Sequence, residues 1–190
     1  MENKTKLTTK KIVFAALMAA LTAVGSALRI TLPLDIAGTT SFHLGNIFCA
    51  LSGILLGPWL GGLAAGLGSA IYDMFNPLYI SEAWITFLLK GAYGLAAGLL
   101  IRAGGKKEPG YLKSVIATVA GAVTYAVLYL AKSYFYSGLL IKGLTPDAAW
   151  LTVIGKLPAT IFNAVVAIIF APILAVAIDK ALKKNHLTLD

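Results

Sequence analysis

The sequence contains few charged residues. Only 13% of its 190 residues are Asp, Glu, Lys or Arg, whereas 58% are apolar and the mean hydropathy is +0.83. Soluble domains average about 25% charged and about 45–50% apolar residues. The interior of a water-soluble protein of this length could not enclose so much apolar surface. We therefore predict an integral membrane protein.

Cysteine and recognisable catalytic motifs are also scarce. The single cysteine, Cys49, excludes an internal disulfide and a cysteine-based metal site, and its apolar neighbours predict a small buried side chain. The sequence lacks the Walker pattern GxxxxGK[ST], the GxSxG and HExxH motifs, and a paired acidic metal signature. We predict no cofactor, no metal and no enzymatic activity. The lack of an internal repeat disfavours an inverted-repeat transporter.

Basic residues exceed acidic ones, and the net charge is +8. The basic residues do not alternate with aromatic ones, as they would on a nucleic-acid platform, so we predict no nucleic-acid partner. They cluster instead beside apolar segments, which is typical of cytoplasmic helix ends. The three clusters are Lys4, Lys6, Lys10 and Lys11, then Arg102, Lys106, Lys107 and Lys113, and finally Lys180, Lys183 and Lys184.

The apolar segments predict an all-α, six-transmembrane-helix bundle that forms a single membrane domain over residues 1–190. An even number of crossings between the basic clusters places both termini in the cytoplasm. Residues 1–28 imitate a signal peptide, but the crossing count requires them, and we interpret them as part of a mature helix. Residues 39–42 are expected to form an outer loop. The helices are expected at about 12–32, 43–56, 60–75, 83–101, 112–141 and 148–182.

Two of these segments, the second and the third, are short. They are joined by an uncharged Gly57-Pro58-Trp59 turn, so a re-entrant hairpin is the alternative to two full crossings. Glycines recur four apart between residues 53 and 66, which predicts close packing between neighbouring helices.

Polar residues recur at helical spacing in the outer halves of the segments, where contact with lipid is unfavourable. Because several helices carry them at a similar depth, we predict one pocket that opens outward. Its aromatic faces would stack on a flat ring, and its polar groups would bond the ring substituents. The predicted substrate-binding residues are His43, Asn46, Asp73, Asn76, Lys90, Tyr93, Tyr125, Tyr129, Lys132, Lys156 and Asn163.

Some of these residues also have a structural interpretation. Lys90 and Lys156 can pair with Asp73 and Glu82 instead of contacting a ligand. Arg29, near a helix end, is typical of a side chain that extends to the membrane interface. Both interpretations stay open at the level of the sequence.

A stripe of alanines marks the inner half of the first segment. Ala15, Ala19 and Ala23 follow each other at a spacing of four. Such a smooth face is usually internal packing, but it also suits a sliding contact with another membrane subunit.

Several motifs resemble one known family. They are HLGN at residues 43–46, LLGPWLGGLAAGLGSAIYD at 55–73, FLLKGAYGLAAGLL at 87–100 and the Ala15-x-x-x-Ala19 spacing. Together with the length and the six expected helices, they resemble the S components of energy-coupling factor (ECF) vitamin transporters, in the riboflavin-type or hydroxymethylpyrimidine-type branch. The resemblance implies a prokaryotic plasma-membrane subunit that captures a vitamin or precursor from outside. It also implies a coupling membrane subunit, which would contact Ala15, Ala19 and Ala23, and two ATPase subunits that drive uptake.

The charges of the predicted pocket indicate the ligand class. We count Lys90, Lys132 and Lys156 against Asp73 and Glu82. This balance disfavours a free cation and favours a neutral or partly anionic heteroaromatic compound of pyridine, pyrimidine or flavin type. A stand-alone permease or channel is the alternative, and an intramembrane enzyme is a further one. A permease requires a polar path to the cytoplasm. Because the inner halves of the helices are apolar, the sequence shows no such path, which disfavours the permease.

Overall fold

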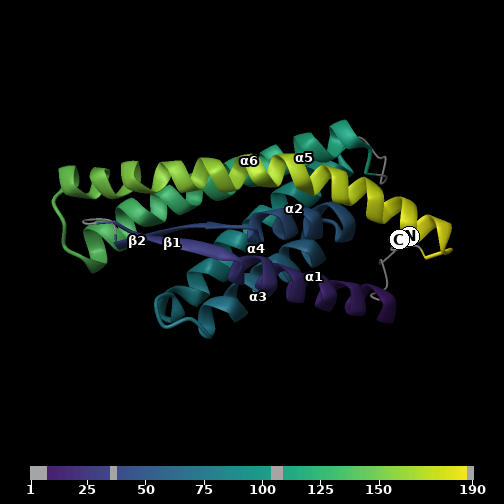
Figure 1. Cartoon of the computed structure of the whole chain (residues 1–190), viewed down its shortest axis with the longest axis horizontal. Coiled ribbons are helices and arrows are strands. Elements are labelled where there is room, and N and C mark those ends of the chain that lie inside the picture. Colours follow the sequence, from purple (N-terminus) through teal and green to yellow (C-terminus); the bar gives the residue numbers. More distant parts are fainter. Residues whose placement is uncertain (1–7, 35–37, 104–108, 188–190) are drawn as a thin grey trace, which may run out of the picture.

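The computed structural model describes residues 8–34, 38–103 and 109–187. Its elements are packed side by side along one long axis, and α1 begins at the end of the molecule where α6 ends (Figure 1). In chain order the elements are α1 (Thr9–Ala27), β1 (Arg29–Leu34), β2 (Gly38–His43), α2 (Gly45–Leu56), α3 (Pro58–Met74), the 3₁₀ turn η1 (Ile80–Glu82), α4 (Ala83–Arg102), α5 (Tyr111–Ala131), the π-helical segment η2 (Lys132–Ile141) and α6 (Pro146–Lys184).

The α-helices lie close to the six predicted segments, but the prediction of an all-α chain is wrong in one place. Residues 28–32 were expected to continue the first helix, and residues 39–42 to form a loop. Instead β1 and β2 form an antiparallel hairpin, in which Arg29 pairs with His43 and Leu34 with Gly38. The β-branched Ile30 and Thr31 favour extended backbone, and a following proline cannot continue a helix.

Within the described residues, four helical stretches are long and apolar enough to cross a membrane. They are Thr9–Ala27, Ile80–Arg102, Tyr111–Ile141 and Pro146–Lys184. The two helices between them, α2 and α3, have 12 and 17 residues. The chain is thus a multi-pass membrane protein, while the number of six crossings and the cytoplasmic termini stay predictions. The basic residues Lys4, Lys6, Lys106 and Lys107 lie outside the described residues.

The turn between α2 and α3 lies beside the end of α4. Gly57 has a φ of +81°, a conformation that favours glycine, and a Cβ there would overlap the guanidinium of Arg102. That guanidinium donates a hydrogen bond to the carbonyl of Leu56 at 3.1 Å. The contact fixes the turn at the end of the bundle opposite the β-hairpin, where the second basic cluster begins.

Glycines bring the backbones of α2, α3 and α4 into contact, as their spacing predicted. A Cβ on Gly53 would lie 2.2 Å from the carbonyl oxygen of Gly94, and one on Gly61 would lie 2.3 Å from that of Ser52. These distances are shorter than any contact between real atoms of these types. The surrounding core is apolar and contains the buried thiol of Cys49, as predicted. The half of the bundle away from the β-hairpin is therefore closely packed.

We predict that Gly53→Ala lowers the midpoint of thermal unfolding in detergent, because α2 and α4 must separate to admit the methyl group. Overpacking of this kind typically costs about 1–3 kcal/mol. Gly91→Ala is the matched control, since its Cβ would meet its nearest neighbour at 3.5 Å, an ordinary contact. Equal unfolding midpoints for Gly53→Ala and the parent protein would contradict this packing argument.

Candidate functional site

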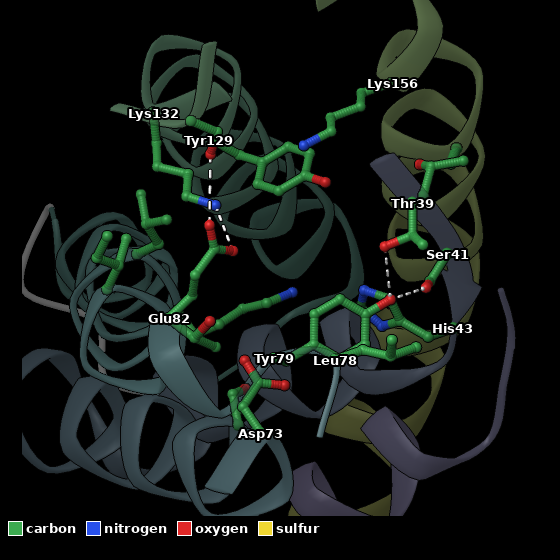
Figure 2. A pocket seen from close by; sticks show the side chains of 18 of the residues that line it. Thr39, Ser41, His43, Asp73, Leu78, Tyr79, Glu82, Tyr129, Lys132 and Lys156 are labelled. Atoms are coloured by element: carbon green, nitrogen blue, oxygen red, sulfur yellow. Dashed lines mark hydrogen bonds and ion pairs between the residues drawn. The ribbon is translucent and has the colours of Figure 1, made fainter. Parts of the chain in front are cut away.

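A cavity of about 280 Å³ lies at the hairpin end of the bundle, between β2 and the adjacent parts of α3, α4, α5 and α6 (Figure 2). Most of its walls are polar or aromatic. Its lining residues that carry charge, hydroxyl, amide or imidazole groups are Ser26, Arg29, Thr39, Thr40, Ser41, His43, Ser69, Asp73, Tyr79, Ser81, Glu82, Thr86, Lys90, Tyr125, Tyr129, Lys132, Ser137, Lys142, Lys156, Thr160 and Asn163.

The structure brings eight of the eleven predicted site residues to this cavity. Helical spacing explains this outcome, because residues four apart on α5 or on α6 face the same side. The eight are His43, Asp73, Lys90, Tyr125, Tyr129, Lys132, Lys156 and Asn163.

The other three predicted residues lie outside the cavity wall. Asn46 is buried, and its Oδ1 accepts a hydrogen bond from Lys90 Nζ. Tyr93 is fully buried beneath the cavity. Asn76 donates to the hydroxyl of Tyr72 at 2.8 Å, in the turn that follows α3. Asn46 and Tyr93 therefore pack behind the cavity wall, and Asn76 stabilises a nearby turn.

The β-hairpin forms a wall that the sequence did not predict. The hydroxyl of Tyr79 lies 3.0 Å from Ser41 Oγ and 3.3 Å from Thr39 Oγ1, which links the loop after α3 to β2 (Figure 2). On the other side, Asn163 Oδ1 accepts from the backbone N–H of His43 at 2.9 Å, and its Nδ2 donates to the carbonyl of Ser41 at 2.8 Å. The loop after α3 and helix α6 thus hold β2 over the cavity.

Each of the two acidic residues described in the cavity lining has a basic partner. Lys132 Nζ lies 2.5 Å from Glu82 Oε2, and Arg29 lies 4.0 Å from Asp73. The predicted alternative pairs, with Lys90 and Lys156 as the cations, are therefore not the ones that form. Arg29 also lines the cavity and lies over the ring of Tyr79 at 4.8 Å.

The π-helical segment η2 helps to build this charged corner. Each π turn contains an extra residue and changes the direction in which the following side chains point. Within η2, Lys132 and Ser137 both reach Glu82, the latter at 3.4 Å. Nothing in the sequence distinguishes this segment from an ordinary α-helical continuation of α5, so Ser137 was not among the predicted residues.

Tyrosines form one continuous aromatic wall. The rings of Tyr125 and Tyr129 are stacked, with centroids 5.5 Å apart and an interplanar angle of 15°. Lys90 Nζ lies 3.9 Å from the centroid of Tyr125, and Lys156 Nζ lies 5.4 Å from that of Tyr129. Aromatic faces stabilise cations at such distances. The wall can equally stack on a planar ligand.

His43 lies in β2, before α2 begins, and its Nδ1 accepts a hydrogen bond from the backbone N–H of Gly45 at 3.1 Å. Burial lowers the pKa of His43 well below its ordinary value of 6.5, and the positive charges of Lys90 and Arg29 lower it further. The imidazole is therefore neutral at physiological pH and fixes the junction between the hairpin and α2. Among the residues that the structure describes, no three His, Cys, Asp or Glu side chains are placed to hold a metal ion.

Comparisons with known proteins agree with this architecture. Residues 6–180 match the model of the family described as "ECF-type riboflavin transporter, S component". An uncharacterized protein of Pyrococcus woesei, encoded in a gap 3′ region, is 31% identical over 110 residues, which are 58% of this chain and 68% of that protein. A crystal structure of an S component of an ECF transporter superposes with a TM-score of 0.52 at 14% identity, over 95% of this chain and 88% of that one. At this identity the structural match shows the fold.

We predict that the protein becomes less stable as the pH falls from about 8 to about 5, partly because of His43. Its pKa in the folded protein lies below that in the unfolded chain, so its contribution is present above the unfolded value and is lost as the pH falls towards the folded one. His43→Asn keeps an acceptor for Gly45 but cannot titrate.

The variant should therefore show a flatter pH dependence of the unfolding midpoint. His186→Asn is the control, because His186 lies near the end of the described chain, remote from the cavity. A His43→Asn protein with the parent's pH dependence would show that the imidazole is not held neutral by the fold.

Proposed function

The chain belongs to the family of S components of ECF-type riboflavin transporters, and from this membership we propose that it is the substrate-binding subunit of an ATP-driven importer. It captures a vitamin or vitamin precursor on the outer side of a prokaryotic plasma membrane. A coupling membrane subunit and two ATPases then supply the energy for uptake. The chain's lack of a Walker motif is consistent with this division of work.

The proposal rests on a ligand-sized cavity at one end of the bundle that does not continue as a polar path toward the other end. Polar groups and tyrosines gather at the hairpin end, whereas an apolar cluster around Met18, Leu51 and Ile101 fills the bundle toward the opposite end. A stand-alone permease or channel needs a polar path through the bundle. A binding subunit needs only a site on one side and a partner that releases the load.

The walls favour a small heteroaromatic ligand. The Tyr125–Tyr129 wall offers a face for a flat ring, and hydroxyl, amide and ammonium groups around it can bond ring substituents. A pyridine, pyrimidine or flavin compound satisfies these requirements. The name of the family makes a flavin one of the compounds to test first.

The coupling subunit is proposed to bind the alanine-rich side of α1. Ala15, Ala19 and Ala23 are half-buried, and the backbone of Ala19 packs against α3, since a Cβ on Gly68 would lie 2.2 Å from its carbonyl oxygen. The neighbouring Ala16 and Ala20 are exposed. Together they form a smooth strip that a helix of another subunit can approach closely.

We expect the protein purified alone in mild detergent to retain a stoichiometric heteroaromatic compound, detected by mass spectrometry after denaturation. Asp73→Asn should lose most of this compound, because the substitution breaks the ion pair that holds Arg29 in the cavity wall. Asp179→Asn is the matched control, since Asp179 pairs with Lys183 near the end of α6, away from the cavity.

Two results would contradict the binding function. One is a protein that carries no ligand and binds none of the candidate vitamins. The other is solute uptake into liposomes that contain this chain without any ATPase, which would identify a permease instead.

We also expect Ala20→Trp to weaken copurification with the coupling subunit and ATPases of the same cell, because the indole would block close helix approach. The ligand content of the variant should be unchanged. Val127→Trp, on an exposed side of α5, is the control for adding a tryptophan to the lipid-facing surface. Unchanged copurification of Ala20→Trp would place the partner on a different face.

A further inference from the structure

The cavity contains more positive than negative charge. Among the described residues that line it, the basic Arg29, Lys90, Lys132 and Lys156 lie with two acidic ones, Asp73 and Glu82. The two carboxylates are already engaged, Glu82 with Lys132 and Asp73 with Arg29. Among the described residues, Lys90 and Lys156 are therefore left without a carboxylate of the cavity as an ion-pair partner.

Lys90 and Lys156 are the two buried lysines of this set, with 4% and 6% of their surface exposed. Within the described parts of the chain, no Asp or Glu oxygen lies within 4.0 Å of either ammonium group. Lys90 nevertheless has a close partner, because it donates to Asn46 and lies over the ring of Tyr125. Lys156 is held much less firmly.

Among the described residues, Lys156 Nζ contacts the hydroxyl of Ser133, at 3.4 Å, and the ring of Tyr129, at 5.4 Å. An ammonium group has three N–H donors, so this arrangement leaves donors without a strong acceptor. Figure 2 shows the side chain extending from α6 toward the ring of Tyr129 at the cavity. A buried cation with only neutral partners is costly unless an anion joins it.

We propose, building on the proposed binding function, that the transported compound is an anion whose carboxylate or phosphate oxygens bind Lys156 Nζ beside Tyr129. Its ring lies along the tyrosine wall, which places the anionic group at the lysine-rich corner formed by η2 and α6. Ammonium-to-oxyanion hydrogen bonds are among the strongest in proteins. The site thereby selects the acid form of a heteroaromatic compound over its neutral amide or alcohol.

The test uses pairs of compounds that share a ring but differ in charge: nicotinate with nicotinamide, orotate with uracil, and flavin mononucleotide with riboflavin. Binding to the ligand-stripped protein is measured by equilibrium dialysis. For whichever pair binds, we expect the dissociation constant of the charged member to be at least about tenfold lower than that of the neutral member. The first two pairs report on a carboxylate and the third on a phosphate.

Lys156→Met should abolish this preference by weakening the charged member alone, and Lys156→Arg should retain it. Lys180→Met removes an exposed lysine further along the same helix and should change neither affinity. Without ligand, Lys156→Met should unfold at a temperature no lower than the parent, because it removes a buried charge. A lower unfolding midpoint would instead indicate that Lys156 has a structural role.

The outcomes separate the two proposals. Equal or tighter binding of the neutral member, a neutral compound recovered from the purified protein, or an unchanged preference in Lys156→Met would overturn the anion proposal and leave the binding function intact. A protein that binds no compound of the panel and carries none from the cell would overturn the binding function, and the anion proposal with it.

Discussion

In an apolar helical bundle every buried charge needs a partner, and this requirement organises the hairpin end of the protein. Glu82 is placed by Lys132 and Ser137, Asp73 by Arg29, and Lys90 by Asn46. These contacts join elements that are 40 or more residues apart in the sequence. The walls of the cavity are therefore fixed by polar pairs, while the opposite half of the bundle is fixed by backbone contacts at glycines.

The helices and most of the site could be predicted because both follow a short-range rule. Lys156 and Asn163 on α6, or Tyr125 and Tyr129 on α5, share a face through the period of the helix alone. Family membership agrees with the predicted transport subunit and excludes the enzyme alternative. The predicted site was less accurate for residues whose depth in the bundle depends on packing against a second structural element. Asn46 and Tyr93 have the right helical phase but lie one layer too deep, behind Lys90 and Tyr125.

The β-hairpin and η2 could not be predicted for a different reason. The segment 29–34 is apolar enough to extend the first helix, and only its pairing with residues 38–43 makes the extended form favourable, since isolated strands leave their backbone groups unpaired. Likewise, η2 differs from an α-helix by one residue per turn, and the choice rests on contacts such as that of Ser137 with Glu82. Arg29 lines the cavity because it is the first residue of the hairpin, which lies beside the cavity.

The same hairpin connects the cavity to the stability of the hairpin end of the bundle. Asn163 uses both atoms of its amide to hold β2, and Tyr79 holds it from the opposite side. If the transported compound is an anion, as proposed, its charge offsets the repulsion between the lysines beneath β2, so binding would strengthen the hairpin end of the bundle. Release would then depend on a partner that loosens the hairpin end, since the glycine contacts of α2, α3 and α4 pack the rest of the bundle closely. In this proposal, the energy of ATP is needed to open a binding site that the bound ligand has stabilised.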